Sequence, residues 1–145
     1  MKYDADLMYT CSLIEFIGRQ QRLPRAAVTD ALGMERLSVI YRHADMLHCE
    51  TIESVAHRFI TEASVPSGTF DNVGRCRYAV PDYWDIGEVY SRLIEDVAGN
   101  DTLETLWAVY HSWIDAAISN YNSDFFYQSR DYIRACYLAG EVLAG

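Results

Sequence analysis

Apolar residues recur at steps of three and four along most of this chain, and this helical period limits the fold more than any other feature. In TIESVAHRFITEA (51–63) they share one face: Ile52, Val55, Ala56, Phe59, Ile60 and Ala63. Such a stripe is typical of an amphipathic helix with one buried side. No segment keeps a two-residue alternation, and RCRYAV (75–80) is at most a short extended piece. The sequence therefore predicts an all-α fold.

The first half of the chain predicts four helices. The first covers about residues 4–20, with an inward stripe of Leu7, Cys11, Ile14 and Ile17. A short second helix starts at Pro24, which suits a first turn, and Gly33 closes it. Two further helices cover 36–49 and 51–63.

The second half predicts three more helices, which makes about seven in all. Asp85 and Glu88 have the spacing of a capping box, with Asp85 as the cap of a helix that follows it. The next helix, 103–121, is the most apolar and therefore central or part of an interface. NYNSD (120–124) ends it, and a last helix covers 130–143.

These helices predict a single domain, residues 1–145, in two packed groups. Residues 4–63 form a four-helix N-terminal group, and residues 86–143 form a three-helix C-terminal group. Residues 64–85 join them as an irregular connector rich in aromatic residues and arginine.

The charge of the chain excludes two classes of partner. Its net charge is −9, from 12 basic and 21 acidic residues. Proteins that bind nucleic acids or anionic lipid surfaces depend on Lys and Arg, so neither partner is expected. No Lys or Arg lies between Arg92 and Arg130, where six acidic residues do. This stretch is either a solvated face or a patch that meets a basic partner protein.

The sequence predicts a cytoplasmic protein. Its start, MKYDADLMYT, lacks the apolar segment of a signal peptide, and no apolar run is long enough to span a membrane. The four cysteines show neither C-x-x-C pairs nor zinc-ligand spacing, so we expect reduced thiols.

No catalytic constellation stands out, so whether the chain is an enzyme stays open, with a non-enzymatic role favoured. His43 and His48 are five residues apart and do not share a helix face as a metal pair would. Ser12 lies within a predicted helix rather than in a nucleophile elbow. We predict no catalytic residue, no metal site and no cofactor.

The candidate binding residues lie in FDNVGRCRYAVPDYWDIG (70–87). They are Asn72, Arg75, Arg77, Tyr78, Asp82, Tyr83 and Trp84. In a structural interpretation the aromatic residues anchor a packed loop, and Arg75 and Arg77 pair with Asp71, Asp82 or Asp85. In a functional interpretation Arg with Tyr and Trp forms an interaction hot spot, or the arginines hold an anionic small ligand. The functional interpretation adds that about twenty irregular residues are unusual inside a compact domain and are often functional or mobile where they occur.

The N-terminal string LIEFIGRQQRLPRAAVTDALGMERLSVIYRHADMLHCETIESVAHRFI (13–60) resembles a family of small uncharacterised bacterial helical proteins. Tyr41, Leu47 and His48 match its Tyr-x-x-x-x-x-Leu-His signature. Members are often encoded beside ADP-ribosyltransferase-like toxins, which implies an accessory or antitoxin-like role. Residues 64–145 resemble only uncharacterised bacterial proteins, and the resemblance implies no catalytic residue.

Three functions remain open at this point. The first is a protein-interaction module, an antitoxin-like partner of a toxin-like protein. The second is a domain, or a minor enzyme, that binds a small anionic ligand in a pocket at the connector. The third is a homo-oligomer held through the apolar 103–121 helix.

Overall fold

A computed structural model describes residues 4–144 and confirms the all-α class. Every regular element of these residues is helical. The elements are α1 (Ala5–Gln21), α2 (Arg25–Arg42), α3 (Ala44–Leu47), α4 (Ile52–Ala63), α5 (Tyr83–Val97), α6 (Thr102–Tyr110), α7 (Ile114–Ser119), the 3₁₀ turn η1 (Phe125–Tyr127) and α8 (Arg130–Ala139). The expectation about the start of the chain concerns its first ten residues, of which 1–3 lie outside the described residues.

Side-chain caps explain where most of the longer helices begin. The residue before each of these helices accepts a hydrogen bond from a backbone N–H of the first turn, which would otherwise have no partner. These caps are Asp4, Thr51, Asp82, Asp101 and Ser129.

The capping box of α5 corrects a prediction. Asp82, rather than Asp85, is the cap, and its carboxylate accepts a hydrogen bond from the Asp85 N–H at 2.7 Å. The Asp85 side chain accepts one in return from the Asp82 N–H at 3.3 Å. The predicted box between Asp85 and Glu88 was wrong, because the helix starts one turn earlier.

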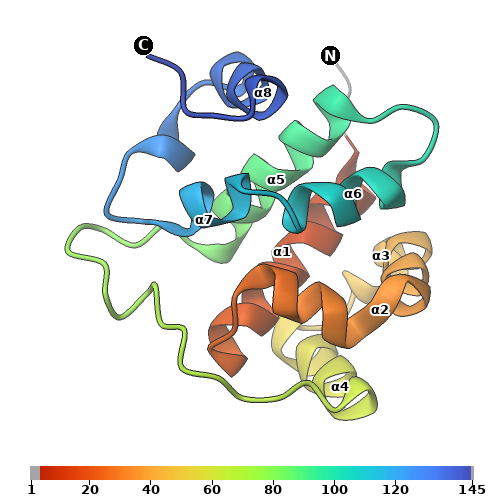
Figure 1. Cartoon of the computed structure of the whole chain (residues 1–145). Helices are drawn as coiled ribbons and strands as arrows, with labels where there is room; N and C mark the ends of the chain where they lie inside the picture. The colour runs from red at the N-terminus through yellow and green to blue at the C-terminus, as the bar shows by residue number, and fades with distance from the viewer. Residues whose placement is uncertain (1–3, 145) are drawn as a thin grey trace.

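The α1 helix lies at the centre of the fold, and its most extensive packing is against α5 (Figure 1). The predicted stripe of Leu7, Cys11, Ile14 and Ile17 is buried, as expected. The two helices approach closely because α5 carries Gly87 at the crossing. A Cβ atom there would lie 2.1 Å from the Ser12 Oγ and 2.7 Å from the Ser12 Cα.

Two predicted helices differ from the structure. The predicted 36–49 helix ends at Arg42, and the separate helix α3 follows it. The predicted break at Gly33 is confirmed, because this residue interrupts α2 with a left-handed φ of 78°, a backbone conformation that suits glycine. The predicted 103–121 helix is broken between α6 and α7, at His111–Trp113. The Ser112 hydroxyl donates to the Val109 carbonyl there, a local bond that competes with helix continuation.

The predicted division into two helix groups is not confirmed, since the packing of α1 against α5 crosses the proposed boundary. The connector is irregular over residues 64–82, and Tyr83 already belongs to α5. It runs along one edge of the molecule between α4 and α5 (Figure 1). Along residues 4–144, no helix combines the length and the apolar character that crossing a membrane requires.

Candidate functional site

The connector is held to the rest of the fold at both halves. In its first half, the Gly68 N–H donates to the Gln21 carbonyl at 2.7 Å and the Phe70 N–H donates to the Arg22 carbonyl at 2.9 Å. Near its middle, Asn72 Nδ2 donates to the Ser119 carbonyl at 3.0 Å. These hydrogen bonds attach the connector to the helices, so it is a fixed part of the fold.

Asn122 completes this attachment from the turn after α7. Its Nδ2 donates to the Arg75 carbonyl at 3.1 Å, and its Oδ1 accepts from the Arg77 N–H at 2.8 Å. Backbone groups of an irregular segment need such partners when they leave water. The arginines of the connector are therefore positioned through their main chain, which leaves their side chains available.

A charged network fills the core beneath the connector. Glu15 of α1 accepts two hydrogen bonds from Arg25, from Nε at 2.8 Å and from Nη2 at 2.7 Å. Arg19 Nε adds a third at 2.9 Å, and the Tyr121 hydroxyl adds a fourth. Gly18 leaves the space for this arrangement, since a Cβ atom there would lie 2.6 Å from Arg25 Nη1.

The network shifts the pKa values of its members. Burial alone would raise the pKa of Glu15, but the charges of Arg25 and Arg19 and their hydrogen bonds hold it below its usual range. Burial and the charge of Glu15 raise the pKa of Tyr121 to about 12, so its hydroxyl stays protonated. Glu15 is therefore an anion locked by donors, which suits a structural role better than proton transfer.

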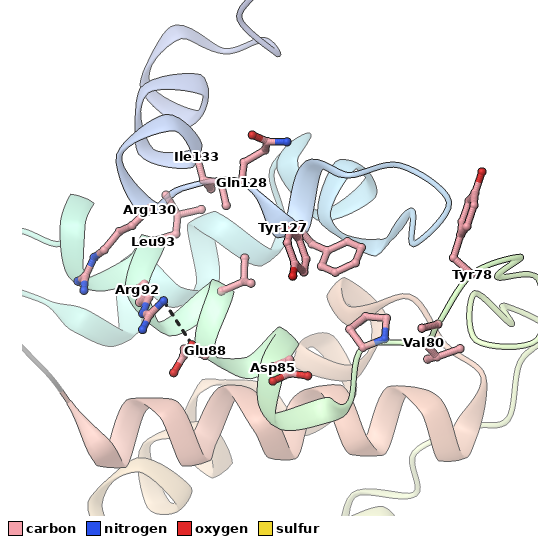
Figure 2. Close-up of a pocket in the computed structure, with 14 residues that line it drawn as sticks. Tyr78, Val80, Asp85, Glu88, Arg92, Leu93, Tyr127, Gln128, Arg130 and Ile133 are labelled. Atoms are coloured by element: carbon pink, nitrogen blue, oxygen red, sulfur yellow. Dashed lines mark ion pairs between the residues drawn. The ribbon is translucent and has the colours of Figure 1, made fainter. Parts of the chain in front are cut away.

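An open hollow of about 650 Å³ lies between α5, the end of the connector and the η1–α8 segment (Figure 2). We call it the α5 groove. It is lined by Tyr78, Ala79, Val80, Pro81, Asp85, Glu88, Val89, Arg92, Leu93, Phe126, Tyr127, Gln128, Arg130 and Ile133. Its size is in the range of ligand and peptide sites.

Large apolar side chains border the α5 groove without being covered. Tyr78 is 67% exposed, Tyr127 is 84% exposed and Val80 is 40% exposed. Figure 2 shows Tyr127 on the η1 side of the hollow, with its ring directed toward α5. Exposed tyrosines beside a hollow are typical of interaction surfaces, because tyrosine combines a large apolar ring with a polar tip.

The basic groups of the groove are already neutralised. Arg92 pairs with Glu88 at 3.3 Å. Arg130 pairs with Glu95 at 2.9 Å and with Asp96 at 2.8 Å. Asp85 faces the groove without a basic partner among the described residues, so the charge left over is negative.

A second hollow, of about 430 Å³, lies where the connector meets α7 and the turn that follows it. We call it the asparagine pocket. It is lined by Pro24, Phe70, Asn72, Arg75, Asp115, Ala116, Ser119, Asn120, Tyr121 and Asn122. The two hollows share no lining residue.

The seven candidate residues do not form one site. Asn72 and Arg75 line the asparagine pocket, Tyr78 lines the α5 groove, and Arg77 is exposed and lines neither hollow. Asp82 is the cap of α5. The predicted ion pairs of Arg75 and Arg77 with Asp71, Asp82 or Asp85 do not form among the described residues.

Tyr83 and Trp84 pack inward from the first turn of α5. The Tyr83 ring meets Phe16 edge-on at 5.1 Å between centroids. The Trp84 ring stacks on His48 at 5.6 Å and lies 6.3 Å from Tyr9. Both side chains are half-buried and support the junction of α1, α3 and α5, and they line neither hollow.

Several residues of these sites were not predicted from the sequence. Val80 of the groove lies in a segment without a period, and Asp115 lies on the α7 helix, at a position with no distinguishing pattern. Glu15 carried a signal, since it interrupts the apolar run LIEFI. A charge on a buried face needs a partner, but no local spacing indicates Arg25.

The comparisons with known proteins give no relative: no family model, no curated protein and no solved structure shows a significant match to the chain.

Proposed function

We propose that this protein is an interaction module that binds a segment of a partner protein in the α5 groove. The observation that carries the proposal is the exposure of Tyr78, Val80 and Tyr127 around one hollow. Exposed apolar side chains that border one hollow are typical of a surface that a partner covers. In this proposal the first half of the connector is a packed structural loop, and the end of the connector, which lines the groove, contacts the partner.

The charge of the groove selects a basic and apolar partner segment. Arg92 and Arg130 are neutralised within the fold, whereas Asp85 is not. The chain as a whole carries a net charge of −9, which attracts a basic partner over distance. A segment with apolar anchors flanked by Lys or Arg complements both properties.

The resemblance of the N-terminal segment makes a toxin-like bacterial protein the class of partner to try first. In this role the chain neutralises or accompanies the toxin by covering a basic surface. Neither catalysis nor a cofactor is part of this function. The localisation that accompanies it is the cytoplasm, where an antitoxin-like protein meets its toxin.

Site-specific photo-cross-linking tests this function. A photoreactive phenylalanine analogue replaces Tyr127 in the full chain, and a control chain carries it at Met46, which is 68% exposed on α3. Cells of the source organism express each chain and are irradiated. The proposal expects one protein with a basic segment to cross-link through position 127 and not through position 46.

Two results would overturn the proposal. One is cross-linking of the same proteins at both positions, which indicates non-specific contact. The other is the absence of any cross-linked protein at position 127, provided that the labelled chain is folded by circular dichroism. A cross-link to a second copy of the chain would support the homo-oligomer instead.

A further inference from the structure

The asparagine pocket has rigid walls. The bonds of Asn72 to Ser119, and of Asn122 to Arg75 and Arg77, tie the connector to the turn after α7. Because the segments that line the pocket are already ordered, the protein loses little conformational entropy when a ligand binds there. The pocket is therefore built as a small-molecule site.

Asp115 supplies a half-satisfied carboxylate at this pocket. The Tyr90 hydroxyl donates to its Oδ1, while no described residue donates to its Oδ2. Burial raises the pKa of Asp115, although the hydrogen bond from Tyr90 and the charge of Arg25 act in the opposite direction. Asp115 is half-buried, and a carboxylate oxygen that has lost water without gaining a donor is stabilised by a cation or by a hydrogen-bond donor.

Arg75 supplies a free cation at the same pocket. Its guanidinium group is exposed and makes no ion pair or hydrogen bond with the described residues, since only its main chain is engaged. A guanidinium group binds a carboxylate through two parallel hydrogen bonds. One acidic and one basic residue, Asp115 and Arg75, thus line the pocket.

Aromatic side chains form the apolar part of the pocket. The Tyr121 hydroxyl donates a hydrogen bond to Glu15, and the Arg25 guanidinium lies 5.9 Å from the centroid of the Phe70 ring. Both rings are therefore held in place by the buried network. The half-buried Phe70 ring leaves an apolar surface against which an aliphatic or aromatic group packs, whereas the Tyr121 ring is buried.

The geometry points to a free amino acid with an apolar or aromatic side chain as the ligand of the asparagine pocket. Its ammonium group meets Asp115, its carboxylate meets Arg75, and its side chain packs against Phe70. A purely anionic ligand, the alternative raised by the sequence, satisfies Arg75 but is repelled by Asp115. This inference concerns a second site and does not depend on the partner bound in the α5 groove.

Nuclear magnetic resonance of the isotope-labelled full chain tests the assignment with three matched probes. The probes are L-phenylalanine, phenethylamine, which lacks the carboxylate, and phenylpropionate, which lacks the amine. The expected result is a saturable shift of the side-chain amides of Asn72, Asn120 and Asn122 with L-phenylalanine at millimolar concentration. The other two probes should bind at least about tenfold more weakly, a loss of 1.4 kcal/mol each.

Two conservative variants test the contributions of Asp115 and Arg75 separately. Asp115→Asn keeps an acceptor for Tyr90 but removes the charge, and Arg75→Gln removes the guanidinium group. Each should weaken L-phenylalanine about tenfold, which again corresponds to 1.4 kcal/mol. The control is Arg134→Gln, an exposed arginine of α8 that lines neither hollow.

Three results would overturn the assignment. Phenylpropionate that binds as tightly as L-phenylalanine would show that Asp115 does not receive an amine. Unchanged binding to Asp115→Asn would show the same. The absence of saturable shifts with L-phenylalanine and with each other apolar or aromatic amino acid would exclude the site itself.

Discussion

Glu15 of α1 and Arg25 at the start of α2 are joined by two parallel hydrogen bonds, of 2.8 Å and 2.7 Å, inside the core. The side chains are 1% and 0% exposed. The pair binds the first two helices to each other, and through Tyr121 it binds them to the turn after α7. Since Glu15 and Tyr121 are 106 positions apart, the network joins segments that are distant in the sequence.

The first prediction concerns the loss of one partner from this pair. Arg25→Met should lower the free energy of unfolding by about 3–5 kcal/mol, because Glu15 is left as a poorly compensated buried charge. The double variant Glu15→Leu, Arg25→Met should lose less than the sum of the two single losses. Urea denaturation of the four chains gives this coupling, and strictly additive losses would contradict it.

The second prediction concerns pH. The pKa of Glu15 is lower in the folded chain than its unfolded value of about 4.3. The folded state thus binds fewer protons, so this group adds stability above that value and loses it as pH falls through the folded pKa. Glu15→Gln should remove this part of the acid dependence, and the two chains should converge in stability at low pH.

Asp115 changes stability with pH in the opposite direction from Glu15, because burial raises the pKa of Asp115 in the folded chain. Its contribution is fully present below the unfolded value of about 3.9 and is lost as pH rises through the folded pKa. Asp115→Asn should therefore gain stability relative to the parent chain as pH rises from acid to neutral. Denaturation midpoints at several pH values measure this, and a constant difference between the chains would contradict it.

The third prediction concerns the crossing of α1 and α5. Gly87→Ala should destabilise the chain by about 1–3 kcal/mol, because the added Cβ atom would lie 2.7 Å from the Ser12 Cα. Gly99→Ala is the control, since a Cβ atom at Gly99 meets nothing within 4 Å. Thermal unfolding followed by circular dichroism should separate the two variants. Equal midpoints would show that the helices adjust freely.

The fourth prediction separates the aromatic residues of the connector region by their role. Trp84→Ala should lower the thermal midpoint, because the indole ring packs on His48 and Tyr9. Tyr127→Ala should leave the midpoint nearly unchanged, because the ring is 84% exposed. If Tyr127→Ala unfolds the chain, the aromatic edge of the groove is structural and not a binding surface.

The sequence predicted those features that depend on local chemistry. Helical period identified the buried stripe of α1, and the conformational freedom of glycine placed a break at Gly33. The cap of α5 was missed by three residues, because Asp82 and Asp85 are both suitable caps and the helix extends to the earlier one. The break at His111–Trp113 lies within an apolar stripe, which carries no sign of it.

The candidate site was predicted only in part, because it depends on contacts between distant segments. Arg75 and Asn72 were chosen from the composition of the connector, but Asn122 and Asp115, which complete their pocket, lie 40 or more residues away. Trp84 was chosen for the same composition, yet the start of α5 turns its ring inward. Composition identified the segment, and only the packing assigned its side chains.

The most direct test of the interaction function is the affinity of the chain for the protein that cross-links at position 127. Isothermal titration compares three chains. They are the parent chain, a double variant that carries both Tyr78→Ala and Tyr127→Ala, and the control Met46→Ala, whose side chain is as exposed as that of Tyr78. We predict that the double variant binds this protein at least about tenfold more weakly than the parent chain, while the affinity of the control is unchanged. Equal affinity of all three chains would contradict the α5 groove as the binding site.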